Sequence, residues 1–251
     1  MVDNILFTKK KSSNLIIVQI YVDAIIFGST CQDMCNEFAK IMLDEFVMRM
    51  MGELNFFLGL QIKQMEDGIF FNQSKYIKEI LKKFGLEDSK PMKTLMSSDT
   101  KLTKDEECGS VDSTKYRGMI GSLLCLTTSR LDIMFSVCLC AQFQKAPKTS
   151  HLEAVKLIFQ YIKGTTHLGL WYHKGTDIET IIYAYSGHAG DYVDRKSTSG
   201  ICTFVGCCLT SWFLKKQIAL AISTTEAEYV TAGKACQQAL WMQQALIDYD
   251  V

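Results

Sequence analysis

The residues with the clearest potential for chemistry lie in residues 15–30, LIIVQIYVDAIIFGST. Two apolar runs, Leu15–Ile20 and Ile25–Gly28, flank the tetrapeptide Tyr21-Val22-Asp23-Ala24. Such runs, rich in β-branched residues, predict two buried strands joined by a tight turn. A carboxylate at the tip of a buried hairpin is costly unless it is satisfied, and a metal ion is a common partner. Asp23 is therefore a candidate metal ligand, and stabilisation of its own turn is the alternative.

A second group of carboxylates lies near the C-terminus, in Thr225-Glu226-Ala227-Glu228-Tyr229. Ser223 and Thr224 precede it, and the segment predicts the start of a long helix running to about Asp248. Glu226 or Glu228 could bind a metal ion. Either could instead be a first-turn carboxylate favoured by the helix dipole.

A basic helix is predicted between these two groups. Its apolar residues repeat at i, i+3, i+4 and i+7, which indicates one buried face ending at Gly85: Ile77, Ile80, Leu81 and Phe84. The other face carries Lys75, Lys78, Lys82 and Lys83. Such a face is a solvated surface in most proteins and contacts phosphate in others, so both remain open.

Composition indicates a globular chain. Its 251 residues are 48% hydrophobic and 22% charged, with a formal net charge of zero. We find neither a signal peptide nor an apolar run near the roughly 20 residues of a membrane helix, so we expect a soluble, intracellular protein with no membrane partner. None of the ten cysteines belongs to a C-x-x-C motif, and we expect buried, reduced thiols.

The two prolines and the glycines divide the chain into three regions. In residues 1–95, the Asp23 hairpin is followed by a predicted helix that carries Met34 and Phe38. A second predicted hairpin comes next, in which Phe56–Ile62 and Ile69–Phe71 flank a turn. Residues 96–166 begin with a polar linker, 97–109, and become helical. The predicted helical segments are Tyr116–Thr127, Leu131–Phe143 and a helix that starts at a capping box, Ser150 and Glu153, and ends at Gly164.

Residues 167–251 change to strand periodicity. The predicted strands are Leu168–Tyr172, Thr180–Tyr185, Gly200–Phe213 and Gln217–Ile222, followed by the long helix. Strands followed by a helix are typical of the opening of a mixed α/β sheet, so we expect further strands beyond Val251.

Several motifs together resemble the Pol polyprotein of copia-type LTR retrotransposons over essentially all residues: YVDAIIFGST, MGELNFFLGLQI, SKYIKEILKKFGL, RKSTSG and ISTTEAEY. The resemblance implies an α+β fold. Residues 1–95 would be the C-terminal part of a reverse transcriptase palm, with active-site and primer-grip-like hairpins. Residues 96–166 would be a helical thumb or connection, and residues 167–251 the N-terminal part of a truncated, ribonuclease H-like mixed α/β sheet.

The resemblance also implies roles for single residues. The turn of a reverse transcriptase carries two aspartates, of which this chain keeps Asp23 and has Ala24 in the second place. In the ribonuclease H motif, Tyr185 stands where the family has its catalytic acidic residue. Gly187 stands at the second acidic position of the motif. Glu228 matches the second carboxylate there, which favours it over Glu226. Asp23 and Glu228 are thus the candidate catalytic residues and Mg²⁺ ligands.

Polymerisation and hybrid cleavage both use two divalent ions, about 3.5–4 Å apart, that several carboxylates hold. Without metal, two carboxylates 4 Å apart repel by roughly 4 kcal/mol at an effective dielectric constant near 20. We expect the other acidic ligands before Met1 and after Val251. The chain is therefore expected to bind Mg²⁺ poorly and to be catalytically inactive.

The implied partners are an RNA template, a DNA primer, an RNA/DNA hybrid and the rest of Pol. Lys75, Lys78 and Lys82 would contact the phosphates of the nucleic acid. The implied location is a cytoplasmic virus-like particle or the nucleus. Two alternatives remain: a non-catalytic nucleic-acid-binding remnant, and a decaying open reading frame without selected function.

Overall fold

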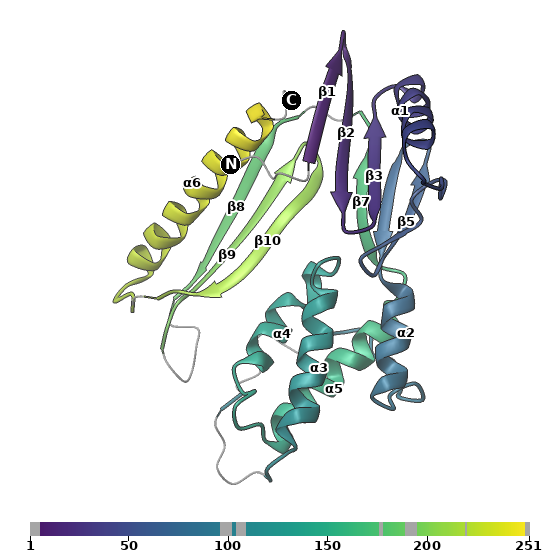
Figure 1. The fold of residues 1–251 in the computed structure, drawn as a ribbon. Helices are drawn as coiled ribbons and strands as arrows, with labels where there is room; N and C mark the ends of the chain where they lie inside the picture. Colours follow the sequence, from purple (N-terminus) through teal and green to yellow (C-terminus); the bar gives the residue numbers. More distant parts are fainter. Residues whose placement is uncertain are drawn as a thin grey trace. The chain divides into compact units, whose positions relative to one another are not determined.

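The computed structural model describes residues 6–95, 102–103, 109–175, 178–188, 195–218 and 220–248. Within these ranges the fold mixes six α-helices and one short 3₁₀ helix with three antiparallel sheets (Figure 1). Most of the predicted linker, 97–109, lies outside the described residues. The chain divides into two compact units, Met1–Asn55 with Gln243–Val251, and Phe56–Met242.

The first unit contains the predicted Asp23 hairpin. Its sheet consists of β1 (Leu6–Lys11), β2 (Asn14–Tyr21) and β3 (Ala24–Ser29), and α1 (Gln32–Glu45) follows. Phe27 of β3 meets Phe38 of α1 edge-to-face, with ring centroids 4.9 Å apart. The expected burial of the hairpin is wrong, because Ile16 is the one fully buried residue of β2 and β3. A three-stranded sheet is too small to enclose its own hairpin tip.

The second unit opens with the second predicted hairpin. The strands β4 (Phe56–Phe57), β5 (Leu60–Met65), β6 (Gly68–Asn72) and β7 (Gly169–His173) form one sheet in that order. The pairing of β7 with β6 joins segments far apart in sequence, from Gly68 opposite His173 to Asn72 opposite Gly169. Glycine is required at both ends, because a Cβ on Gly68 would lie 2.3 Å from the Tyr172 carbonyl oxygen and one on Gly169 2.1 Å from that of Phe71.

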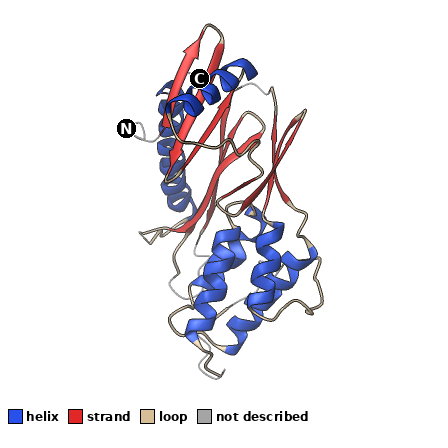
Figure 2. Cartoon of the chain, turned by 45° about the vertical axis from the view of Figure 1, so that its right-hand side comes forward, coloured by secondary structure: helices blue, strands red, loops and turns tan. Residues whose placement is uncertain are grey.

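A helical bundle lies between β6 and β7 in the chain. It consists of α2 (Ser74–Lys83), α3 (Ser113–Leu126), η1 (Leu131–Ile133), α4 (Met134–Ala141) and α5 (Thr149–Gly164), whose helices group together in Figure 2. These helices confirm the predicted periodicity. The predicted capping box at Ser150 is wrong: α5 starts at Thr149, and the Lys148 amide donates to Nδ1 of the buried His151 (3.1 Å).

The largest apolar core of the described residues lies inside this bundle. The Tyr116 hydroxyl donates to the Cys140 carbonyl oxygen at 2.8 Å. Burial raises the pKa of the Tyr116 phenol, and it raises that of the Cys140 thiol to about 12, so both are neutral at pH 7. The nine described cysteines are free thiols. The expectation that cysteines are buried holds for Cys140 and Cys208 and is wrong for the exposed Cys125, Cys207 and Cys236.

The third sheet contains β8 (Thr180–Gly187), β9 (Thr198–Val205) and β10 (Cys208–Lys216), in the order β10-β9-β8. The prediction of one strand over Gly200–Phe213 is wrong, because the chain turns at Gly206 (φ +60°) between β9 and β10. The predicted strand Gln217–Ile222 is also wrong, since its described residues lie outside any strand. The long helix is confirmed as α6 (Thr224–Asp248).

The bundle core predicts a strong contrast between two neighbouring leucines. Leu123 is fully buried, whereas Leu124 is 40% exposed. We expect Leu123→Ala to lower the free energy of unfolding by about 3 kcal/mol, because it leaves a cavity. Leu124→Ala should change it by less than about 1 kcal/mol. Urea unfolding followed by far-UV circular dichroism measures both, and equal losses would contradict the assignment of this core.

Candidate functional site

Asp23 lies in the two-residue turn between β2 and β3. Tyr21 pairs with Ala24, so Val22 and Asp23 form the loop. Val22 is 90% exposed and has a φ of +50°. A β-branched residue in the left-handed region is strained, by an amount on the order of 1–3 kcal/mol. The hairpin therefore holds Asp23 at an exposed, tightly constrained tip.

The surroundings of Asp23 do not fit a pair of metal ions. Its side chain is exposed, and the next residue is Ala24. Across the described ranges, no group of three or more His, Cys, Asp or Glu side chains could hold a metal ion. A two-metal centre needs several converging carboxylates. The described residues thus supply one carboxylate at this turn and not the set that would hold Mg²⁺.

The two glutamates at the start of α6 have different surroundings. An oxygen of Glu226 accepts a hydrogen bond from the Ile222 amide at 2.8 Å, and the Glu226 amide donates to the Ser223 hydroxyl at 3.1 Å. This reciprocal pattern is a capping arrangement. The capping role therefore belongs to Glu226, while Glu228 presents an exposed side chain in the following turn.

The helix segment that carries Glu228 is fixed to the third sheet by a buried polar cluster. The side-chain amide of Gln217, which is 1% exposed, donates to the Ala227 carbonyl oxygen at 2.8 Å. The Ser199 and Thr231 hydroxyls lie 2.7 Å apart. Ser199 pairs with Ser186, next to Gly187 at the end of β8. Glu228 thus has a defined position relative to this strand end, where neither Tyr185 nor Gly187 provides a carboxylate.

The lysine helix α2 is attached to the second hairpin at its first turn. Oε1 of Gln61, on β5, accepts from the Ser74 hydroxyl and from the Lys75 amide, both at 2.7 Å. This side chain satisfies a donor that the helix leaves unpaired at its N-terminus. The ammonium group of Lys75 lies 5.7 Å from the ring centre of Phe56, on β4. The hairpin thereby determines where the helix begins.

The predicted lysine face is present on α2. Lys75, Lys78 and Lys82 are exposed, and the opposite face buries Ile77, Ile80 and Leu81 in the bundle core. The structure brings these three lysines onto one helix face, in the second unit, while Asp23 belongs to the first. They form an exposed positive surface beside the β4–β5 hairpin.

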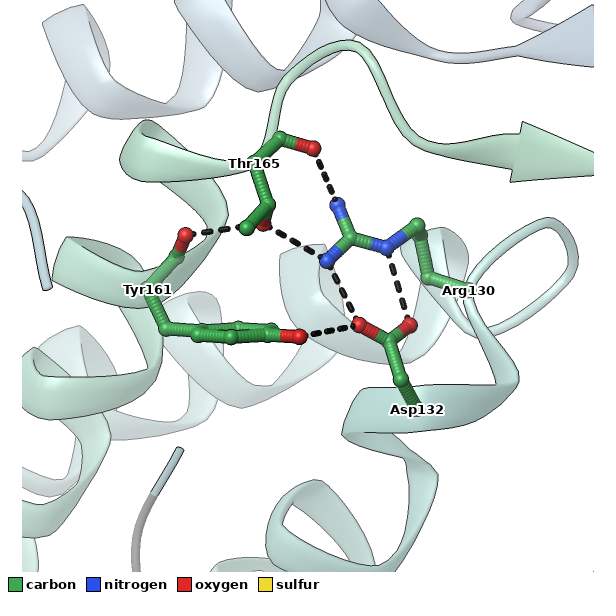
Figure 3. Close-up of polar contacts among 4 residues, drawn as sticks. All are labelled: Arg130, Asp132, Tyr161 and Thr165. Carbon is green, nitrogen blue, oxygen red and sulfur yellow. Dashed lines mark hydrogen bonds and ion pairs between the residues drawn. The ribbon is translucent and has the colours of Figure 1, made fainter. Parts of the chain in front are cut away.

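An ionic network around the buried Arg130, which the sequence did not indicate, joins the start of η1 to the end of α5 (Figure 3). Arg130, 2% exposed, makes two hydrogen bonds to the carboxylate of Asp132, at 2.9 and 2.7 Å. It also donates to the carbonyl oxygen and the hydroxyl of Thr165, at 2.9 and 2.8 Å. The Tyr161 hydroxyl donates to Asp132 at 2.8 Å. The one sequence signal was an arginine two residues before an aspartate, which is too common to single out.

The charge state of this network follows from its contacts. Burial alone would raise the pKa of Asp132, but the hydrogen bonds and charge of Arg130, with the Tyr161 hydroxyl, hold it below its ordinary value. Burial and the neighbouring Asp132 raise the pKa of Tyr161. The network therefore contains an ionised carboxylate and a neutral phenol at neutral pH, and it fastens the start of η1 to the end of α5.

Comparison with known proteins places these elements in a family. Residues 2–98 match the family described as "Reverse transcriptase (RNA-dependent DNA polymerase)". The chain is 32% identical, over 223 residues, to the "Uncharacterized mitochondrial protein AtMg00810" of Arabidopsis thaliana, covering 88% of this chain and 92% of that protein. It is 30% identical over 249 residues to the "Retrovirus-related Pol polyprotein from transposon RE1" of the same plant. The chain belongs to the copia-type retrotransposon Pol family.

The match to RE1 covers 99% of this Pol-family chain and 17% of that polyprotein. The "Retrovirus-related Pol polyprotein from transposon TNT 1-94" of Nicotiana tabacum is 31% identical over 250 residues, which cover 96% of this chain and 19% of that polyprotein. The chain thus spans less than a fifth of either polyprotein. No solved structure matches it. None of the described helices is long and apolar enough to cross a membrane.

The ionic network gives a prediction for stability and its pH dependence. Asp132→Asn leaves the buried guanidinium of Arg130 without its charged acceptor, and we expect a loss of about 2 kcal/mol in the free energy of unfolding at pH 7. Because the native pKa of Asp132 lies below the ordinary 3.8, its stabilisation is present above that pH and lost as the pH falls through the native value.

The gap between wild type and Asp132→Asn should therefore shrink below about pH 4. Urea unfolding at pH 7, 5 and 3 measures it, and the exposed Asp88→Asn is the matched control. A gap that is constant across this range would show that the carboxylate charge does not contribute.

Proposed function

We propose that this chain is a part of a copia-type Pol protein that holds nucleic acid and does not itself catalyse polymerisation or hybrid cleavage. Residues 1–95 would be reverse transcriptase palm, residues 96–166 thumb or connection, and residues 167–251 ribonuclease H-like. The observation that carries the proposal is the contrast between an exposed three-lysine face on α2 and isolated carboxylates at Asp23 and Glu228.

Three features support the division into these parts. The match to the reverse transcriptase family covers residues 2–98, which contain both hairpins and α2. The helices α3–α5, within residues 96–166, build a continuous apolar core, as expected of a helical thumb, and α2 of the preceding part packs against it. The antiparallel strands β8–β10 followed by α6 have the order of elements that the resemblance to ribonuclease H implies.

The expected ligand of the lysine face is the sugar–phosphate backbone of an RNA/DNA hybrid or a primer–template. Successive lysines on this face are separated by three and four positions, so the three side chains project in one direction. Lysine contacts to phosphate release condensed counterions and supply affinity without sequence preference. Gln61 and Phe56 support the first of these lysines, so the adjoining hairpin would meet the same nucleic acid.

The proposed lack of catalysis rests on the residues present at each turn. Asp23 would supply one carboxylate to a Mg²⁺ pair, and Ala24 supplies none. In the ribonuclease H-like part Glu228 would be the remaining carboxylate, since Tyr185 and Gly187 carry no acidic group. Removing a residue that only supports a metal ligand costs about 10–100-fold in affinity or activity, and losing a ligand itself should cost more.

This predicts that the purified chain, supplied with Mg²⁺, an RNA template and a DNA primer, extends the primer no faster than Asp23→Asn does. A gel-based extension assay measures incorporation, with an intact reverse transcriptase as positive control. Extension by the wild type that Asp23→Asn abolishes would overturn the proposed inactivity. It would leave the proposed binding untouched.

The lysine face predicts a specific loss of binding. Lys75→Gln, Lys78→Gln and Lys82→Gln combined should weaken binding to an RNA/DNA hybrid and reduce the salt slope of log K by up to about 3, one for each lost contact. Fluorescence anisotropy between 50 and 200 mM salt measures both. The control combines Lys40→Gln, Lys145→Gln and Lys156→Gln, which are exposed lysines outside this face. Equal losses would mean that net charge alone governs binding.

A further inference from the structure

An apolar groove in the second unit includes Tyr185 of the ribonuclease H-like strand end and is otherwise lined by residues of none of the sites above. It lies between the start of α4 and the sheet β8–β10, as two adjoining cavities of about 220 and 310 Å³ that share Phe135 and Leu214. One wall comes from η1 and α4, with Leu131, Met134 and Phe135. The other wall is the face of the third sheet opposite to α6.

The alternation of the strands identifies that face. In β9 the buried residues Ser199, Ile201 and Thr203 face α6, as the contact of Ser199 with Thr231 indicates. Gly200 and Cys202 therefore face the groove, opposite their cross-strand partners Tyr185 and Tyr183. At Gly200 the groove has no side chain, and a Cβ there would lie 3.3 Å from Leu214 and 3.9 Å from Tyr185.

Two large aromatic side chains are left open on this face. Tyr183 is 63% exposed and Tyr185 is 68% exposed. They are two residues apart on one strand, so they project from the same face about 7 Å from each other. Phe135 on the opposite wall is 46% exposed. Exposed aromatic rings on a sheet face are the surface on which nucleic-acid-binding sheets stack successive bases.

Both walls of the groove are held in place by partly buried hydrogen bonds. The indole N–H of Trp212, on β10, donates to the Thr127 carbonyl oxygen at the end of α3 (2.9 Å). On the helical side, the network of Arg130 fixes η1, which leads directly into Met134 and Phe135. The groove is thus preformed, which lowers the cost of ordering a binding site.

The charge at one end of the groove indicates which kind of molecule it binds. Lys216 lines the second cavity and places a cation at this end of the groove. Apolar rings with a cationic end match an unpaired nucleic acid strand, whose bases stack while a phosphate meets the lysine. We propose that this groove binds single-stranded nucleic acid, with successive bases on Tyr183 and Tyr185. The site is distinct from the lysine face of α2 and rests on the proposed function only in taking nucleic acid as its ligand.

The test uses the whole chain and a fluorescein-labelled 12-mer of deoxythymidine, with anisotropy as the readout. Combining Tyr183→Ala with Tyr185→Ala should weaken binding at least about 30-fold, the loss of two stacked bases. The matched variant with Tyr183→Phe and Tyr185→Phe keeps both rings and should bind within about 3-fold of wild type. Circular dichroism checks that all variants fold.

A second probe changes the ligand and leaves the protein intact. A 12-mer of the same charge whose central residues are abasic should bind wild type weakly, and the alanine variant should not distinguish it from the thymidine 12-mer. Equal binding of the two oligonucleotides to wild type would overturn the proposal. So would an unchanged affinity in the alanine variant, which would leave the groove as a site for an apolar protein segment.

These outcomes are separable from the lysine-face prediction. The alanine variant should retain its affinity for the RNA/DNA hybrid, and the variant of Lys75, Lys78 and Lys82 should still discriminate the abasic 12-mer. If thymidine binding depends on the lysines and not on the tyrosines, the groove proposal fails and the proposed function stands.

Discussion

The pairing of β6 with β7 is the constraint on which the second unit depends. It joins Asn72 to Gly169 across the whole helical bundle, so α2 and α5 must begin and end at the same sheet. Closing so long a segment has an entropic cost that grows only slowly with its length. The backbones approach closely enough that Gly68 and Gly169 cannot carry a Cβ. The Tyr172 hydroxyl extends the connection by donating to the Leu209 carbonyl oxygen of β10 at 2.7 Å.

This constraint brings the polar groups of the bundle into contact. Once β7 is fixed to β6, the end of α5 lies where Arg130 can reach Thr165, and the ion pair with Asp132 closes against it. Gln73, at the start of α2, makes a similar link, accepting from the Ser129 hydroxyl at 2.7 Å. A buried guanidinium is expensive unless its donors are satisfied. These contacts therefore specify one arrangement of the helices.

The proposed functions of this Pol-family chain depend on surfaces that the same scaffold leaves open. The apolar side of α2 packs in the bundle core, and the lysines on its other side remain in solvent. One face of the third sheet is used by α6, which leaves Tyr183 and Tyr185 uncovered. In both cases an element has one buried face and one available face. The acidic residues show the opposite pattern, since Asp23 and Glu228 lie on well-positioned elements without converging partners among the described residues.

Local patterns predicted most of the elements. Hairpins, amphipathic helices and the long C-terminal helix follow from periodicities of 2 and 3.6 residues, which neighbouring residues alone determine. The failures have identifiable causes. Gly206 is a weak turn signal within an apolar run, and Gln217 looked like part of a strand because its buried contacts with α6 are invisible in the sequence. The predicted cap of α5 at Ser150 was wrong because His151, which accepts the hydrogen bond from the Lys148 amide, is held in the core by stacking on Phe143.

The sequence by itself determined the family resemblance, the candidate carboxylates, the lysine face and the proposed losses at Ala24, Tyr185 and Gly187, because these depend on residue identity and short spacing. Only the tertiary structure decided that β7 joins the β4–β6 sheet, that Arg130 is buried in an ionic network, and that Tyr183 and Tyr185 border a groove. Each of these joins residues that are distant in the chain. Such contacts depend on the packing of whole elements, which no local pattern encodes.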